Sequence, residues 1–299
     1  MASMDLKFVI LFLFPIVIGS LGNFFHFWHS TCLYFSGCRS RFIDFILRHL
    51  SVANLLVILS RGIPETMAAL GMEEFLNNVG CKLVFYVQML GKGVSFSNTC
   101  LLSVFQAITI SPRSSRWAEL KVKALKCIGP CPIICWVLHM LLNIRVPMLV
   151  SDKRNNKNIT NTIDYQYCTA MSPDKDKNSI FVALTLSHDI LCLKLMIWSS
   201  GSMAFILYRH KQRTQHIHRH ISSRSSPETR ASQSILMLVC TFVSLYALTS
   251  IMNVWFSFYS KPAWWLVKTS ALIHVCFPTI SPFILMTREQ LVCRLMWKK

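Results

Sequence analysis

The distribution of charge along this chain constrains its fold more than any other feature. No Asp, Glu, Lys or Arg occurs from Phe8 to Cys38, or between Arg230 and Lys261. The hydrocarbon core of a bilayer is about 30 Å thick, and a helix needs about 20 apolar residues to cross it. Charged residues make up 15% of the chain, whereas soluble domains carry about 25%. We therefore expect an all-α membrane protein.

Seven stretches are long and apolar enough to span a bilayer, although charges interrupt the second, third and fifth. Lipid cannot hydrogen-bond to the backbone, so each span must be a complete helix. The chain is expected to form one seven-transmembrane domain over residues 1–299, with spans near 8–35, 43–63, 82–110, 127–150, 179–208, 232–259 and 265–287.

The first apolar stretch could also be a secretory signal peptide. The apolar core of a signal peptide is about 7–15 residues long. The uncharged run from Phe8 to Cys38 is much longer, and no convincing cleavage site closes it. We interpret it as a retained first transmembrane helix.

Basic residues predict how the bundle is oriented. The connecting segments 39–41, 113–126, 209–230 and 288–299 carry 17 Lys and Arg against three acids. Cytoplasmic loops are enriched in Lys and Arg, so these segments belong inside the cell. Seven spans then place the N-terminus outside and the C-terminus in the cytosol.

Two features fall on the predicted outer side. Cys81 lies at the mouth of the third span and Cys168 in the longest outer loop, where an oxidising compartment permits a disulfide between them. Asn158 begins the glycosylation sequon Asn158-Ile159-Thr160 in the same loop.

No motif of a common enzyme class occurs in the sequence: G-x-S-x-G, H-E-x-x-H, the P-loop and G-x-G-x-x-G are all missing. The net charge of +18 is spread in short blocks between apolar stretches, whereas a nucleic-acid binder gathers its charge on one face. The tract His216, His218, His220 lies in a basic loop without Cys or acidic neighbours. We expect no enzyme, metal site, cofactor or nucleic-acid partner.

Charges inside the spans are the candidate functional groups. A charge at the centre of a membrane helix costs about 2.5–3.5 kcal/mol, so such residues face partners, water or ligands. Lys92 lies in the third span, and Asp189 and Lys194 lie in the fifth. Arg61 and Glu65 stand four residues apart near the outer end of the second span, with Pro64 between them. Structural bonding between helices is the alternative to ligand contact for all five.

Such a bundle suits signal transmission, because a ligand in its outer half could bias the positions of the helices. Seven spans also fit a small-solute transporter or channel. Transporters often contain internal repeats with matching broken helices, and the two halves of this sequence show no such symmetry.

Five blocks of the sequence carry a family resemblance: HLSVANLLVILSRGIPETMAALG, ILYRHKQRTQHIH, SSPETRASQSILMLVCTFVS, CFPTISPFILM and the long stretch from Gly80 to Lys121. In these blocks the sequence resembles the vomeronasal type-1 receptors, a family of pheromone-type G protein-coupled receptors. The resemblance implies a rhodopsin-like bundle in the plasma membrane of chemosensory neurons. It also implies coupling to a heterotrimeric Gi/o-type G protein and small organic ligands, either pheromones or steroid-like molecules.

Several positions depart from the wider rhodopsin-like pattern. Asn23 and Trp136 are kept, but Asn54 replaces the usual Asp of the second span, which puts a sodium site in doubt. Phe105-Gln106-Ala107 stands where Asp-Arg-Tyr is expected, and only the Pro of Asn-Pro-x-x-Tyr remains, at Pro282. The usual activation switches therefore do not carry over to this chain.

The resemblance also suggests where the ligand and the G protein bind. Gln88 and Lys92 share a face of the third span at the level of the expected ligand pocket, and Asp189 is a third candidate. Lys92 could pair with an acidic or sulfated ligand. Candidate contacts of the G protein are Gln106, Arg113, Arg116, Lys121, Arg209, Lys211 and Arg213, whose basic members could instead only set the topology.

A bitter-taste-like chemoreceptor is a second interpretation, because such receptors share the unusual end of the third span. The blocks GIPETMAA and SSPETRASQSIL argue against it.

Overall fold

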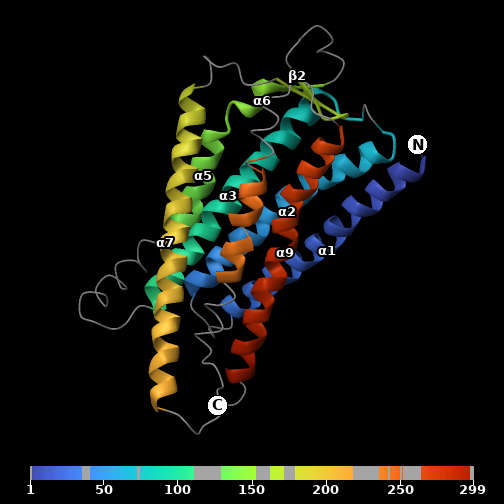
Figure 1. The fold of residues 1–299 in the computed structure, drawn as a ribbon. Coiled ribbons are helices and arrows are strands. Elements are labelled where there is room, and N and C mark those ends of the chain that lie inside the picture. Colours follow the sequence, from blue (N-terminus) through green and yellow to red (C-terminus); the bar gives the residue numbers. More distant parts are fainter. Residues whose placement is uncertain are drawn as a thin grey trace.

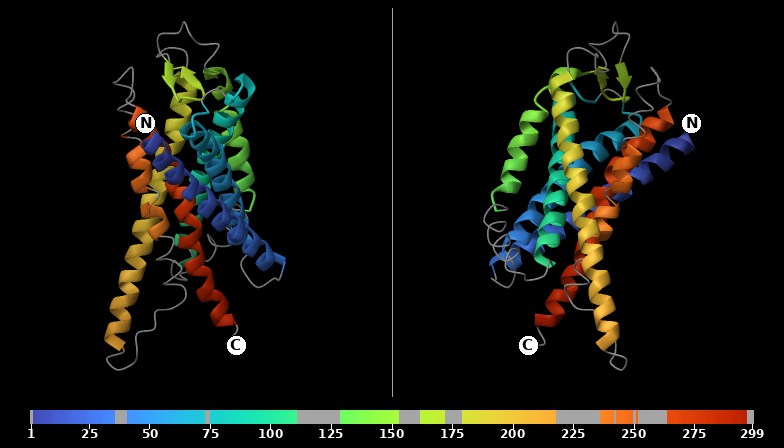
Figure 2. Two further views of the ribbon diagram at one scale, coloured as in Figure 1. Left: turned by 90° about the vertical axis from the view of Figure 1, so that its right-hand side faces the viewer. Right: turned by 60° about the vertical axis from the view of Figure 1, so that its left-hand side comes forward.

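The computed structural model is a bundle of long helices closed at one end by a small sheet (Figure 1). It describes residues 2–35, 41–72, 75–110, 129–152, 162–171, 179–217, 236–241, 243–249, 251 and 264–296. The N-terminus lies near the end that carries the sheet, and the C-terminus lies at the opposite end (Figures 1 and 2).

The long helices are α1 (Ala2–Phe35), α2 (Arg41–Ala69), α3 (Asn78–Ile110), α5 (Cys131–Leu142), α7 (Ser179–Ile217) and α9 (Trp264–Met296). A shorter apolar helix over Leu236–Thr249, here the 236–249 helix, falls within the sixth predicted span. Six of the described helices are long and apolar enough to cross a membrane.

Three helices run beyond their predicted spans at their C-terminal ends. α2 continues to Ala69, α7 to Ile217 and α9 to Met296. The predicted spans stopped where the apolar stretch ended, but a helix does not have to end at the surface of the membrane. The predicted spans therefore stay predictions of where the chain crosses the bilayer, and the helices extend past them.

The fourth predicted span is broken near its end. α5 stops at Leu142, a turn follows, and the four-residue α6 (Val146–Leu149) leads directly into a strand. Pro147 explains the break, because it has no N–H to offer to the carbonyl four residues earlier and its ring clashes there.

The prediction of an all-α protein missed a small antiparallel sheet. Its strands are β1 (Val150–Ser151), β2 (Thr162–Asp164) and β3 (Thr169–Met171), in the order β1-β3-β2. Ala170 in the central strand pairs with Val150 on one side and Ile163 on the other. Strands of two or three residues are too short to show an alternating pattern in a sequence.

A disulfide fastens this sheet to the bundle. Cys81 of α3 is bonded to Cys168, with 5.8 Å between their Cα atoms. Both cysteines are completely buried, as is Tyr167 beside them, and they pack with Phe85 and Ala68. The pair is the one that the sequence predicted, and it fixes the sheet over the end of α3.

Two glycines on α3 let other helices approach it closely. A Cβ on Gly91 would lie 2.9 Å from the carbonyl oxygen of Ala53 on α2, and a Cβ on Gly93 would overlap the imidazole of His139 on α5. Close approach through small residues is how helices associate within membranes. These glycines flank Lys92 and bring α2 and α5 against α3 at its level.

Candidate ligand-binding site

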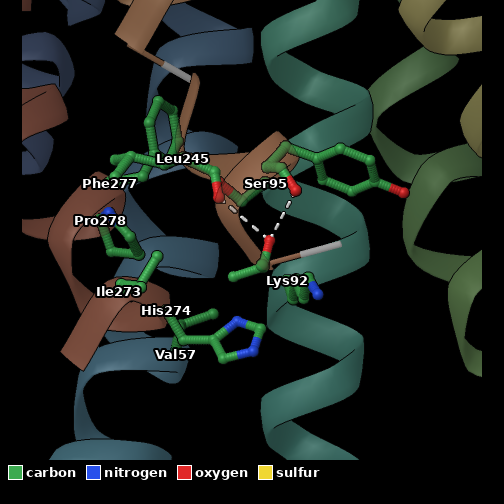
Figure 3. A pocket seen from close by; sticks show the side chains of 10 residues that line it. Val57, Lys92, Ser95, Leu245, Ile273, His274, Phe277 and Pro278 are labelled. Atoms are coloured by element: carbon green, nitrogen blue, oxygen red, sulfur yellow. Dashed lines mark hydrogen bonds between the residues drawn. The ribbon is translucent and has the colours of Figure 1, made fainter. Parts of the chain in front are cut away.

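A pocket, here called the cavity, lies between α2, α3, the 236–249 helix and α9 (Figure 3). Pockets for small molecules combine apolar walls with a few polar groups. The apolar walls here include Val57, Leu245, Ile273 and Phe277, and the polar groups include Lys92 and His274.

Lys92 is the charged group of this cavity. Its ammonium nitrogen lies 5.9 Å from the centre of the Tyr246 ring. Within the described residues it makes no hydrogen bond or ion pair; its electrostatic neighbours are Asp189, of opposite charge, and Arg61, of like charge. A desolvated cation that borders a cavity favours an anionic group at the same place.

The other two predicted pocket residues are placed differently. Gln88 is buried on α3, one turn closer to the sheet, and its Oε1 has no hydrogen-bond partner. Asp189 on α7 is bonded to the cavity residue Tyr246, whose hydroxyl donates to Asp189 Oδ2 at 2.7 Å. Neither side chain lines the cavity itself.

Four polar lining residues were missed at the sequence level: Ser95, Tyr246, Thr249 and His274. His274 stands in an otherwise apolar run of α9 and could have been noticed as a titratable group inside a span. The other three are common residues of membrane helices, so only the packing of the helices assigns them to the cavity.

A buried ion cluster lies between the cavity and the sheet. Glu65 on α2 accepts from Lys268 Nζ on α9 at 2.7 Å, and its other oxygen lies 3.2 Å from Arg61 Nη2. These three side chains are at most 5% exposed. The helix continues through Pro64, so Arg61 and Glu65 pair across one turn. With one carboxylate and two cations, the cluster carries a net charge of +1.

The sheet covers this cluster with two tyrosines. Arg61 Nη1 donates to the Tyr167 hydroxyl at 3.4 Å, and the guanidinium lies 5.1 Å from the centre of the Tyr165 ring. Burial raises the pKa of Tyr165 and Tyr167 above its ordinary value, so both hydroxyls stay neutral at physiological pH. The loop that carries the disulfide is thereby also bonded to α2.

On the side of the cavity away from the sheet, neutral side chains connect four helices by hydrogen bonds. Asn54 Nδ2 donates to Ser281 Oγ at 2.7 Å, and Ser95 Oγ donates to Asn54 Oδ1 at 2.7 Å. Asn23 Nδ2 donates to the Pro278 carbonyl at 2.8 Å. Pro282, four residues further along α9, has no N–H for that carbonyl, so Asn23 replaces the missing helical donor.

The described part of the chain contains no group of three or more His, Cys, Asp or Glu arranged to hold a metal ion.

Comparison with known proteins decides the family. Residues 6–298 match the model of the vomeronasal organ pheromone receptor family. The chain belongs to this family. It is 52% identical to vomeronasal type-1 receptor 2 of Homo sapiens over 278 residues, which is 93% of this chain and 70% of that protein. It is 49% identical to human vomeronasal type-1 receptor 3 over 297 residues, covering 99% of this chain and 95% of that protein.

A more distant relative is olfactory receptor class A-like protein 1 of Danio rerio, 26% identical over 249 residues, or 83% of this chain and 78% of that protein. The resemblance noted in the sequence is confirmed. The chain is a multi-pass plasma-membrane protein of a chemosensory G protein-coupled receptor family, whose members are receptors rather than enzymes. Membership implies a ligand, a G protein and a bilayer as its partners.

The proposed G-protein contacts of this vomeronasal-type receptor are only partly visible. Gln106 is buried near the end of α3, and Arg209 lies over the Phe205 ring at 5.5 Å on α7. Lys211 and Arg213 lie on the same helix, where only the backbone is described. Other predicted sites fall outside the described residues: Arg113, Arg116, Lys121 and the sequon residue Asn158.

Proposed function

We propose that this chain is a chemosensory receptor that binds a small organic ligand in the cavity beside Lys92 and signals through a Gi/o-type G protein. The observation that carries the proposal is the cavity itself, which four helices border and which Lys92 and apolar side chains line together. A ligand that contacts several helices at once can favour one arrangement of the bundle over another.

The proposed arrangement is a rhodopsin-like bundle with the N-terminus outside the cell. The distribution of Lys and Arg supports this orientation, and the disulfide between Cys81 and Cys168 suits an oxidising compartment. The sheet end then faces the outside. We place the sugar on Asn158 in the same outer loop.

The ligand class follows from the charge at the cavity. Lys92 has no ion-pair partner among the described residues, whereas the Glu65 carboxylate already forms ion pairs with Arg61 and Lys268. A ligand with an acidic or sulfated group and an apolar body would place its charge at Lys92. Its body would contact the apolar walls formed by Leu245, Ile273 and Phe277.

The G protein is proposed to bind at the end opposite the sheet. Arg209, Lys211 and Arg213 near the end of α7, together with Arg113, Arg116 and Lys121 after α3, supply the basic groups. Gln106 is buried in this structure, so it could contact the G protein only in a second arrangement of the helices.

A Gi/o activation assay tests this function. The receptor is expressed at the cell surface and screened against volatile, steroid-like and acidic compounds. We expect a dose-dependent response that a Gi/o blocker abolishes. A ligand response that persists under the blocker would contradict Gi/o coupling, and ligand-dependent solute flux in protein-only liposomes would contradict the receptor class.

A further inference from the structure

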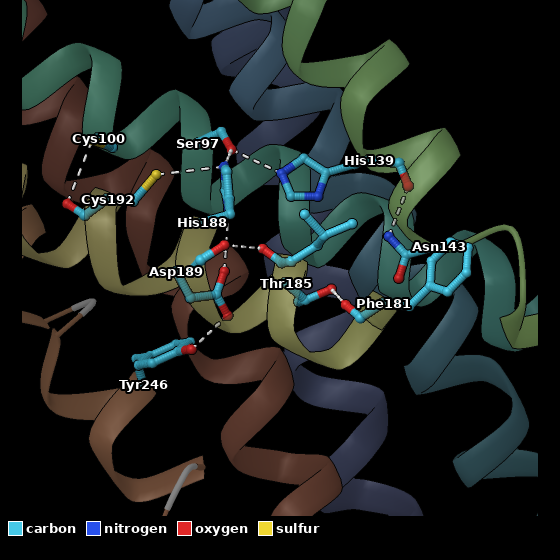
Figure 4. Close-up of polar contacts among 12 residues, drawn as sticks. Ser97, Cys100, His139, Asn143, Phe181, Thr185, His188, Asp189, Cys192 and Tyr246 are labelled. Atoms are coloured by element: carbon cyan, nitrogen blue, oxygen red, sulfur yellow. Dashed lines mark hydrogen bonds and ion pairs between the residues drawn. The ribbon is translucent and has the colours of Figure 1, made fainter. Parts of the chain in front are cut away.

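Beside the cavity, a chain of hydrogen bonds crosses four helices (Figure 4). His139 of α5 and His188 of α7 both direct Nε2 at the hydroxyl of Ser97 on α3, at 2.8 and 3.3 Å. His188 Nδ1 lies 3.2 Å from Asp189 Oδ1. Tyr246 of the 236–249 helix donates to the other oxygen of the same carboxylate at 2.7 Å.

Hydrogen-bonding capacity links the members of this chain of hydrogen bonds in one order. When Nδ1–H of His188 donates to Asp189 and Ser97 donates to Nε2 of His188, the Ser97 oxygen accepts from Nε2–H of His139. Cys192 Sγ lies 3.5 Å from the same His188 Nε2. Among the described residues that are bonded here, Asp189 is the one carboxylate, and it accepts from His188 of its own helix and from Tyr246 of the 236–249 helix.

Tyr246 belongs both to this chain and to the cavity. It lines the cavity, and Lys92 lies over its ring. Other hydroxyl side chains of the 236–249 helix, those of Thr241, Ser244 and Thr249, donate to carbonyls of their own helix. Among the described residues, Tyr246 is thus the one member of this helix whose side chain hydrogen-bonds to another helix.

The ring and the hydroxyl of Tyr246 are held by different helices. The ring stacks on Phe96 of α3, with centroids 5.3 Å apart and planes at 13°, while the hydroxyl is bonded to α7. Removal of the hydroxyl alone should leave the ring in place and break only the bond to Asp189. The function of that bond can therefore be tested separately from the packing.

We propose that the hydrogen bond between Tyr246 and Asp189, which we call the joint, breaks when the ligand binds. Asp189 is the positioning residue that keeps Tyr246 bonded to α7 in the receptor without ligand. The Tyr246 hydroxyl has one hydrogen, so an acceptor on a ligand at Lys92 that takes this hydrogen releases Asp189. The 236–249 helix then loses its side-chain hydrogen bond to α7. A ligand that favours the released arrangement shifts the population of the bundle toward it. This inference rests on the proposed function for its signalling readout.

The joint predicts that Tyr246→Phe and Asp189→Asn each mimic the ligand. At matched surface expression, ligand-independent G-protein activation should rise roughly tenfold, because a bond to a charged acceptor that stabilised the closed state is lost or weakened. The double variant should rise no further than the stronger single variant, since both changes act on the same bond. Basal activity that stays unchanged or falls in both single variants overturns the proposal.

Tyr86→Phe is the matched control. The Tyr86 hydroxyl of α3 donates to the Met140 carbonyl of α5 at 3.4 Å, so this variant also removes a tyrosine hydroxyl from between two helices. Its basal activity should stay at the level of the unmodified receptor. A rise equal to that of Tyr246→Phe would mean that any loosening of the bundle activates it, and it would overturn the assignment of the joint.

A distance measurement separates this inference from the proposed function. Spin labels are attached through non-natural side chains at Met237 and Tyr208, which are exposed on the 236–249 helix and α7. Tyr246→Phe should lengthen or broaden the distance distribution without any ligand. An unchanged distribution overturns the joint. If the unmodified receptor never activates a G protein, the proposed function fails, but this distance still decides whether the joint holds the two helices together.

Discussion

Replacement of Glu65 by Gln should destabilise the receptor more than any other single change to the ion cluster. Glu65 is completely buried, 2.7 Å from Lys268 Nζ and 3.2 Å from Arg61 Nη2. Taken as point charges at an effective dielectric constant of about 20, these distances correspond to roughly 6 and 5 kcal/mol of gross attraction. Desolvation offsets most of it, so only the removal of one partner reveals how far the cluster depends on the carboxylate.

Glu65→Gln leaves two buried cations beside a neutral amide. Breaking a buried ion pair from one side costs about 3–5 kcal/mol, and we expect a loss of this size in the free energy of unfolding. Lys268→Met is the matched control, because it removes the surplus cation and leaves the pair of Arg61 and Glu65 balanced. It should destabilise the receptor less than Glu65→Gln. The double variant should regain part of the loss, since it removes one of the two unpaired cations.

The assay is thermal unfolding of the full-length receptor in detergent, followed by fluorescence-detected size exclusion after heating. The expected order of stability is unmodified receptor, Lys268→Met, the double variant and then Glu65→Gln. The reasoning is refuted if Lys268→Met is as damaging as Glu65→Gln, or if the double variant is less stable than Glu65→Gln. Either result would mean that packing, not charge balance, decides the stability of the cluster.

Three further predictions concern other contacts that hold the bundle together, and they use the same unfolding assay. Asn23→Ala should cost about 1–3 kcal/mol, because the Pro278 carbonyl loses its donor at 2.8 Å and keeps the longer bond from Ser281 Oγ at 3.4 Å; no loss would show that Ser281 replaces Asn23. Tyr167→Ala should cost about 3–5 kcal/mol, as large-to-small changes at buried aromatic residues do, whereas Tyr167→Phe should cost under about 1.5 kcal/mol; equal losses would contradict a role for the ring. Gly93→Ala should cost about 1–3 kcal/mol by overpacking, since the added methyl group would overlap His139, and a neutral effect would mean that α5 moves away freely.

The sequence predicted what is local along the chain. The positions of the membrane helices follow from long stretches rich in apolar residues, which are visible without knowing any contact. The ends of α2, α7 and α9 do not, because a helix can continue through polar residues after it leaves the bilayer. The break before Pro147 could have been predicted from the proline alone.

Contacts between distant segments were harder to foresee. Lys268 forms its ion pair with Glu65 across 203 residues of sequence, and nothing local to either residue specifies that pairing. The charge in the middle of WWLVKTSALIHV was nevertheless a visible signal that a partner was needed. Arg61 and Glu65 stand four residues apart, which made a pair between them possible, and their side chains lie 3.2 Å apart.

In the candidate site too, the local signals could be read from the sequence and the contacts between helices could not. Lys92 was identified because a cation inside a span demands an explanation, and it does line the cavity. Tyr246 carries no comparable signal in the sequence. Its importance depends on the arrangement of α3, α7 and the 236–249 helix, which brings its hydroxyl to Asp189 and its ring to Phe96.

The charge at Lys92 offers the most direct test of the proposed ligand site. The measurement compares dose–response curves for an acidic ligand and its neutral analogue on the unmodified receptor, on Lys92→Gln and on Lys92→Arg, at matched surface expression. We predict that Lys92→Gln weakens the acidic ligand about tenfold or more, equivalent to about 1.4 kcal/mol, and leaves the neutral analogue unchanged, while Lys92→Arg retains most of the response. Equal shifts for both ligands, or none for either, would contradict a ligand whose charge is bound by Lys92.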